Sequence, residues 1–266
     1  MFWKVAVTCL ITAMIFTFAG CSADDGETKT ARKKFQPGEN TMEMKSTQEN
    51  LYSDGRMVQI DFYGHKNEQG MPVEWSLVVD EHEMVRLDGE NGTYTIADFK
   101  LQDIDGKKGP EVLLYLYNTG SSGAQRLNIF KPSKEGWHEL FNVPNPFDMG
   151  AERFESQYVG DYKVNFRDKE TGLEHIIDLE KDRYDGIEEM LEGISTWVDP
   201  IAEYRIDDHD RDGVDEIVTV QRVIGVAHVD TIATLQTVYR LRDGRYQAGQ
   251  VILTTDTGEL LVEKKM

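Results

Sequence analysis

Apolar residues recur at every second position over much of the chain from Leu51 onward, as in Val58-Ile60-Phe62. Successive side chains of a β-strand point to opposite faces, so a period of two predicts strands with one buried face. Turn-forming pairs such as Asp88-Gly89 interrupt these runs at short intervals. We therefore predict an antiparallel all-β domain over residues 51–266. Residues 185–193 are the exception, because their apolar positions have helical spacing and predict one short helix.

A four-stranded unit with an acidic loop after its first strand recurs in the pattern. One copy is predicted at residues 94–103, 111–117, 126–131 and 137–143, and the other at 203–207, 216–224, 231–241 and 246–253. Residues 61–64 are expected to begin an earlier, degenerate unit, and residues 153–179 to supply one without its loop. Such units are typical of propeller blades. The pattern thus predicts blade-like repeats in a small or incomplete β-propeller, with an irregular β-sandwich as the alternative.

The first 20 residues have the order of a signal peptide. A start carrying Lys4 is followed by an apolar run over residues 5–18 and by Ala19-Gly20-Cys21. The run is shorter than the roughly 20 residues that cross a membrane. This end of the chain resembles a bacterial lipobox, although Phe18 replaces the usual leucine. The resemblance implies lipidation of Cys21 and anchoring on the outer face of the cell membrane, with plain secretion or a retained N-terminal anchor as alternatives.

Residues 21–50 are polar and almost without periodic apolar positions, which predicts a flexible tether behind the lipidated cysteine. The second cysteine, Cys9, lies within the predicted signal peptide and would leave with it. The mature chain would then form no disulfide of its own, so we expect its own core or a metal to stabilise the domain.

The chain carries 29 basic and 48 acidic residues, a formal net charge of −19. Such a polyanion is repelled by nucleic acid and by anionic lipid, so neither is an expected partner of the folded part. Cations, basic proteins and neutral ligands remain possible partners. Solubility alone would also explain the acidity.

The sharpest motif is the segment from Asp208 to Glu216, Asp-His-Asp-Arg-Asp-Gly-Val-Asp-Glu. Asp208, Asp210, Asp212 and Glu216, with the carbonyl of Val214, would surround a hard cation with oxygen, a ligand set that suits calcium. Thr219 stands where a helix-loop-helix calcium site needs a bidentate glutamate, and the following residues predict a strand. The alternative is an acidic surface turn that binds nothing.

The loop and the strand after it resemble FG-GAP or VCBS-type repeats, in which such a loop binds calcium between the first two strands of a blade. The wider stretch 197–222 also resembles uncharacterised lipoproteins of Gram-positive spore formers. The earlier loop, residues 103–111, keeps acids at positions 1, 3 and 9 but has Lys107 at position 5. That ammonium predicts a self-neutralised turn without metal.

Catalytic signatures such as Gly-x-Ser-x-Gly or His-Glu-x-x-His do not occur, and the six histidines are scattered. We therefore expect a non-catalytic, lipid-anchored surface module, braced by calcium, that presents loops to a protein or wall polymer. The alternative is an extracellular hydrolase of wall carbohydrate. A solute-binding lipoprotein is a third possibility, but that class normally alternates strands with many helices.

Overall fold

The computed structural model describes residues 34–90, 92–143, 153–193 and 196–266. The predicted signal peptide and the predicted lipidation site Cys21 lie outside these residues. In the described part of the chain, no helix has the length and apolar character needed to cross a membrane.

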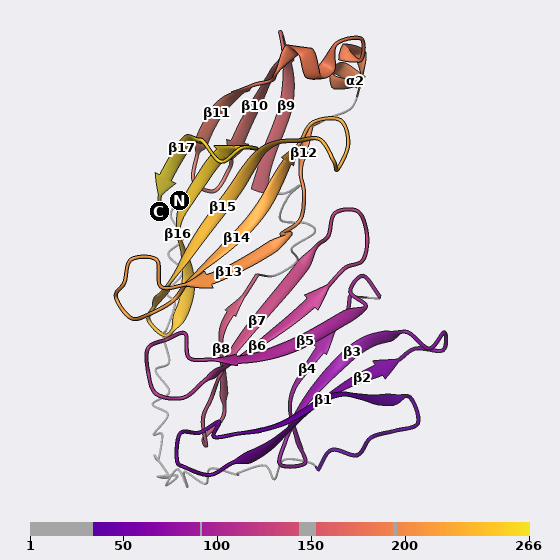
Figure 1. The fold of residues 1–266 in the computed structure, drawn as a ribbon, viewed down its shortest axis with the longest axis vertical. Helices are drawn as coiled ribbons and strands as arrows, with labels where there is room; N and C mark the ends of the chain where they lie inside the picture. Colours follow the sequence, from indigo (N-terminus) through magenta and orange to yellow (C-terminus); the bar gives the residue numbers. More distant parts are fainter. Residues whose placement is uncertain (1–33, 91, 144–152, 194–195) are drawn as a thin grey trace, which may run out of the picture. The chain divides into compact units, whose positions relative to one another are not determined.

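The described chain folds into four antiparallel sheets, which Figure 1 colours in chain order from indigo to yellow. The first contains β1 (Thr41–Glu49), β2 (Val58–Lys66), β3 (Pro72–Val79) and β4 (His82–Asp88) in sequential order. The second contains β5 (Ile96–Gln102), β6 (Glu111–Tyr117), β7 (Gln125–Pro132) and β8 (Trp137–Asn142), also in sequential order.

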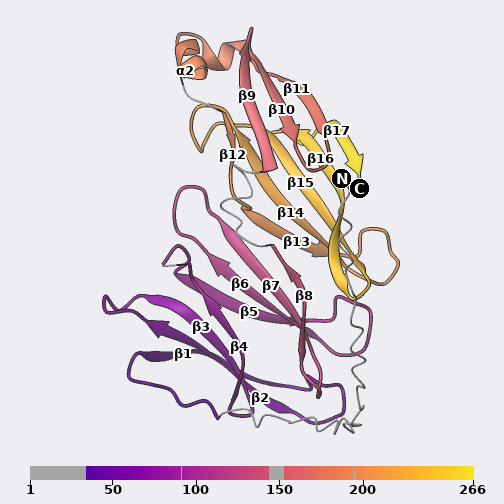
Figure 2. The same cartoon turned by 180° about the vertical axis from the view of Figure 1, so that it is seen from behind.

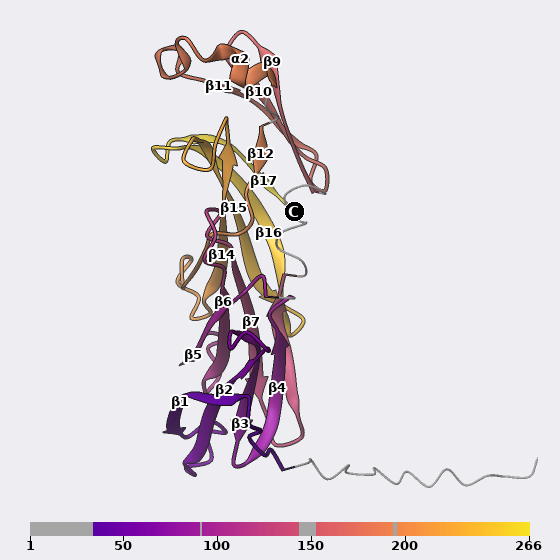
Figure 3. The same ribbon diagram turned by 90° about the vertical axis from the view of Figure 1, so that its right-hand side faces the viewer.

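The third sheet has the order β11-β10-β9, from β9 (Phe154–Gly160), β10 (Lys163–Asp168) and β11 (Leu173–Asp178). A 3-10 helix η1 (Lys181–Tyr184) and the helix α2 (Glu188–Gly193) follow it. The last sheet contains β12 (Trp197–Val198), β13 (Glu203–Asp207), β14 (Glu216–Ile224), β15 (Thr231–Arg242), β16 (Arg245–Thr255) and β17 (Leu260–Lys265). Figure 3 shows β9–β11 as a layer distinct from β14–β16. The all-β fold class is confirmed, and none of the described sheets closes into a barrel.

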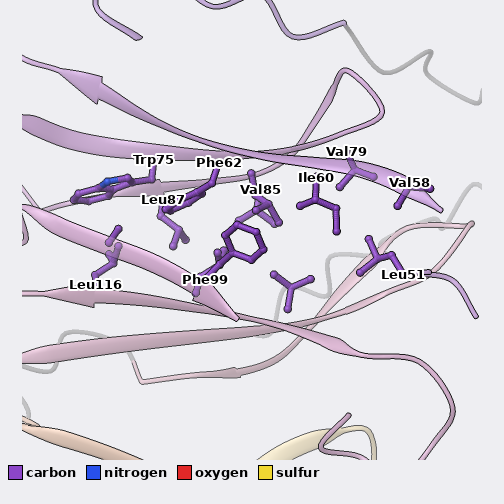
Figure 4. Close-up of a cluster of buried hydrophobic side chains, with 14 of the residues drawn as sticks. Leu51, Val58, Ile60, Phe62, Trp75, Val79, Val85, Leu87, Phe99 and Leu116 are labelled. Atoms are coloured by element: carbon purple, nitrogen blue, oxygen red, sulfur yellow. The ribbon is translucent and has the colours of Figure 1, made fainter. Parts of the chain in front are cut away.

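Three apolar clusters join neighbouring sheets. Side chains of β2–β4 pack on alternate residues of β5 and β6, and Figure 4 shows Phe62 and Val85 from the first sheet pointing toward Phe99 and Leu116 from the second. The other face of β6 packs against Ile217 and its neighbours in the last sheet. Because β6 is covered on both faces, its sequence is continuously apolar from residue 112 to 116, whereas β2 alternates.

Both predicted four-stranded units are present. Strands β5–β8 and β13–β16 lie within two residues of the predicted ranges, and in each unit the acidic loop joins the first two strands. The predicted earlier unit is placed differently, because residues 61–64 lie in the middle of β2 in a sheet that begins at Thr41. Residues 153–179 form the expected loop-free unit, with three strands.

One expectation about the N-terminal part of the described chain is wrong. Residues 41–49 are part of the predicted flexible tether but form β1, which pairs with β2 along its whole length. β1 is an edge strand with mostly exposed side chains, so backbone hydrogen bonds hold it without an apolar pattern. The predicted short helix is confirmed, although α2 covers only Glu188–Gly193 of the predicted 185–193 and, of its residues, buries Leu191 alone.

Candidate functional site: two acidic loops in equivalent positions

The loop between β13 and β14 gathers carboxylates. Oxygen atoms of Asp208, Asp210 and Glu216 lie within 4.8 Å of one another. Glu216 is buried at the start of β14, and its Oε2 accepts a hydrogen bond from the His209 amide at 3.0 Å. The arrangement offers a hard cation several oxygen ligands at one point.

Asp208 shapes the loop as well as contributing to the cluster. Its carboxylate accepts hydrogen bonds from the amides of Asp212 at 3.0 Å and Gly213 at 3.1 Å. Gly213 has a φ of 90°, a conformation that glycine adopts without strain. The exposed Asp212 accepts a hydrogen bond from the amide of Val214 at 2.8 Å and is not part of the cluster. Three of the four predicted carboxylates are therefore brought together.

Arg240 also lies beside the cluster, although no sequence motif marks it as part of the site. Its Nε is 3.3 Å from Oε1 of Glu216 and 3.9 Å from Oδ2 of Asp210. Burial, with the nearby carboxylate of Asp210, raises the pKa of Glu216 despite the His209 amide and the Arg240 guanidinium. The cluster thus holds more negative charge than the one guanidinium neutralises.

The loop between β5 and β6 repeats this geometry. Oxygen atoms of Asp103, Asp105 and Glu111 lie within 4.8 Å of one another. Glu111 is fully buried, at 0% exposure, and its Oε2 accepts a hydrogen bond from the Ile104 amide at 2.7 Å. Ile104 and His209 hold equivalent places in their loops, so the internal repeat extends to hydrogen bonds around the acids.

An ammonium group occupies the cluster of Asp103, Asp105 and Glu111. It belongs to Lys131 and not to Lys107. Lys131 Nζ donates to Oε1 of Glu111, to Oδ1 of Asp105 at 3.0 Å, and to the carbonyls of Gly109 at 3.1 Å and Lys107 at 3.3 Å. The Lys107 side chain is 73% exposed, and its Nζ is 3.9 Å from Asp105. The prediction of a self-neutralised turn thus identified the wrong lysine.

The sheet register explains why Lys131 and Arg240 are equivalent. Val112 pairs with Phe130, which places Lys131 opposite Glu111. Ile217 pairs with Tyr239, which places Arg240 opposite Glu216. A basic residue on the third strand of each unit therefore faces the last acid of the loop, at a sequence distance set by the hairpin length.

The two loops also contact each other. The amide of Asp215 donates to the carbonyl of Ile104 at 2.8 Å, and the Tyr246 hydroxyl donates to the same carbonyl at 3.1 Å. A Cβ atom on Gly106 would lie only 2.4 Å from the carbonyl oxygen of Gly213. A cation bound in the second loop would therefore stabilise a segment that packs directly on the first.

Comparison with known proteins gives two findings. The family model described as the YybI C-terminal domain matches residues 152–254, which include the second acidic loop. The "Uncharacterized protein YybI" of Bacillus subtilis (strain 168) is 24% identical over 232 residues, covering 82% of this chain and 87% of that protein. This is weak homology, and no FG-GAP or VCBS repeat family is matched.

Proposed function

We propose that the chain is a lipid-anchored, extracytoplasmic, non-catalytic module whose β-domain is braced by calcium and presents loops to a protein or wall polymer. The cluster of Asp208, Asp210 and Glu216 carries the proposal, because its oxygens converge within 4.8 Å. In the equivalent loop, residues 103–111, the carboxylates also converge, but the Lys131 ammonium contacts four oxygen atoms there and offsets the negative charge. In the second loop Arg240 contacts only two of the acids.

A thermal-unfolding titration tests the calcium site. Extracellular modules bind calcium with dissociation constants of about 0.1–1 mM. At about 1 mM ion and the tighter end of that range, binding adds about 1.4 kcal/mol to the free energy of unfolding. For a domain of this size that corresponds to a rise in melting temperature of about 3–6 °C, reversed by chelator.

Substitutions locate the calcium effect. Asp210→Ala should abolish the calcium-dependent rise, whereas Asp178→Ala, which removes an exposed carboxylate from β11, should retain it. Lys107→Ala should also leave the response intact. A melting temperature that does not move up to about 10 mM calcium would identify the loop as an ordinary acidic turn.

The lipid anchor has its own test. Cys21→Ser should leave the precursor unprocessed, while the wild-type mature chain should partition into detergent and carry a modified N-terminal cysteine. A mature protein that begins elsewhere without lipid would refute the anchor. Turnover of wall carbohydrate that one carboxylate substitution abolishes would instead favour the hydrolase.

A further inference from the structure

The hairpin of β15 and β16 carries basic side chains at its turn. Figures 1 and 2 both show this hairpin between β14 and β17, with its turn beside the loop between β13 and β14. Arg242 pairs with Arg245, and Asp243 and Gly244 lie between them. Both turn residues have a positive φ, 51° and 79°, as in the two-residue turns that match the twist of a hairpin. Two arginines therefore close the hairpin directly opposite each other.

These arginines share one face of the last sheet with Arg240. Tyr239 and Leu241 pack toward the second sheet. Successive side chains of a strand point to opposite faces, so Arg240 and Arg242 point to the other face. Arg245 lies on that face too, because residues paired across two strands have their side chains on the same side. We call Arg240, Arg242 and Arg245 the arginine cluster.

A glycine leaves room between two of these guanidinium groups. Gly249 is the extra residue of a bulge in β16, where the register with β15 shifts. A Cβ atom on Gly249 would lie 3.4 Å from Nη1 of Arg240 and 3.5 Å from Nη2 of Arg242, so these two nitrogens are at most about 7 Å apart. Charge-assisted N–H···O bonds measure about 2.7–2.9 Å, so one anionic group can bond to both nitrogens at once.

Most of the arginine cluster lacks a counter-charge. Nε of Arg240 lies 3.3 Å from Oε1 of Glu216. Among the described residues, no carboxylate oxygen lies within 4.0 Å of the side-chain nitrogens of Arg242 or Arg245. Like charges directly opposite each other destabilise a pair of strands. An anion held between these arginines would remove that repulsion.

The surroundings of the cluster add further donors. Gln247 pairs with Arg240 and so lies on the same face. Lys265 of β17 pairs with Gln250, which places an ammonium group on this face as well. Glu263 also borders the cluster, but its Oε2 already accepts a hydrogen bond from the Gln250 amide at 2.9 Å. This end of the face is therefore rich in cationic and neutral hydrogen-bond donors.

The chain's net charge of −19 is compatible with an anion at this place. At physiological ionic strength the Debye length is about 8 Å, so exposed charges beyond that distance are largely screened and the nearby arginines dominate. A guanidinium group presents a planar fork of donors that matches carboxylate and phosphate oxygens. A phosphate group has three strong acceptor oxygens and a carboxylate has two, so three guanidinium groups favour phosphate.

We propose that the arginine cluster binds a phosphate group over Gly249, as free phosphate or as part of an anionic polymer. The inference goes beyond the proposed function and requires neither calcium nor the lipid. A calorimetric titration of the full mature chain, in detergent with chelator and about 150 mM salt, tests it. Inorganic phosphate should bind with a dissociation constant of about 1 mM or tighter. A glycerol-phosphate polymer distinguishes the sources, because binding at least about tenfold tighter per phosphate group would identify the polymer and equal binding would identify free phosphate.

Two variants and a control locate the site. Arg242→Gln should weaken phosphate binding at least about tenfold, because it removes charge-assisted hydrogen bonds. Arg167→Gln, which removes the same charge from an exposed arginine of β10, should have little effect. Gly249→Ala should weaken binding at least about threefold, because its methyl group would fill the space between the guanidinium groups. This variant should fold, because the added Cβ would meet its neighbours at ordinary packing distances of 3.4 Å or more.

No phosphate binding up to about 10 mM, or equal effects of Arg242→Gln and Arg167→Gln, would overturn the proposal. If an end-capped tetraglutamate binds more tightly than either phosphate probe and Arg242→Gln abolishes that binding, the cluster belongs to a carboxylate-bearing protein instead. The chelator separates this inference from the calcium brace. Phosphate binding by a chain whose melting temperature calcium leaves unchanged would refute the brace and support the phosphate site, and calcium stabilisation without phosphate binding would do the reverse.

Discussion

Lys131→Met removes an ammonium from the centre of the first acidic loop while keeping a side chain of similar length. It leaves the carboxylates of Glu111 and Asp105, both buried, within 4.8 Å of each other. At that distance and an effective dielectric constant of about 20, their repulsion is about 3.5 kcal/mol. Breaking a buried ion pair by removing one partner typically costs about 3–5 kcal/mol. Lys131 keeps 22% of its side chain exposed, which favours the lower end of that range.

Thermal and urea unfolding measure the loss. A cost of about 3 kcal/mol should lower the melting temperature by about 6–12 °C. Lys134→Met is the matched control, because the same charge is removed from an exposed pair with Asp54. Surface pairs contribute about 0–1 kcal/mol, so the control should unfold close to the wild type.

Calcium should partly restore the Lys131→Met variant, because the vacated loop then presents three acids to a cation. With a dissociation constant of about 1 mM, 10 mM calcium adds about 1.4 kcal/mol to its free energy of unfolding. Equal melting temperatures of the two variants would show that the ammonium does not stabilise the loop. A large loss that calcium fails to reverse would show that the loop requires a lysine and cannot accept a metal.

Two further outcomes are expected. Arg240→Gln should tighten calcium binding about three- to tenfold in a calorimetric titration, because the competing guanidinium lies 3.3 Å from Glu216, and unchanged affinity would place the ion elsewhere. Burial raises the pKa of Asp168, but hydrogen bonds from Arg153 and Thr171 outweigh it and hold the pKa below its ordinary value. The pair therefore stabilises the fold at neutral pH and loses that contribution as pH falls through the lowered pKa, so Asp168→Asn should cost about 3 kcal/mol at pH 7 and flatten the acid limb of a stability–pH curve.

The strands could be predicted where one face is buried, because apolar residues then occur at every second position of the sequence. Units β5–β8 and β13–β16 were found because turns and acidic loops separate their apolar runs. β1 was missed because backbone pairing with β2 holds it in the sheet, and its sequence has no alternating apolar residues that would indicate a strand. The helix was overestimated because apolar spacing over residues 187–194 suggested a longer buried stripe, whereas Ile187 and Met190 are exposed.

The acids of the candidate site could be predicted, but their basic partners could not. The acids are local, since one loop of nine residues contains all of them. Lys131 and Arg240 reach the loops through sheet register, and the two hairpins that set this register differ in length. Asp199 and His228 are 29 residues apart and come into contact only in the folded chain, so the sequence alone could not indicate that they interact.

Repulsion between clustered carboxylates occurs in both loops, and the two loops differ in the cation that offsets it. Each unit buries a glutamate at the start of its second strand and brings two aspartates close to it. In the first unit the ammonium of Lys131 offsets these charges, independently of the ions in solution. In the second, under the proposed function, the offset depends on dissolved calcium, with Arg240 as a partial substitute. Because the Asp215 amide and the Tyr246 hydroxyl both bond to Ile104, the ion's contribution acts directly on the contact between the repeats.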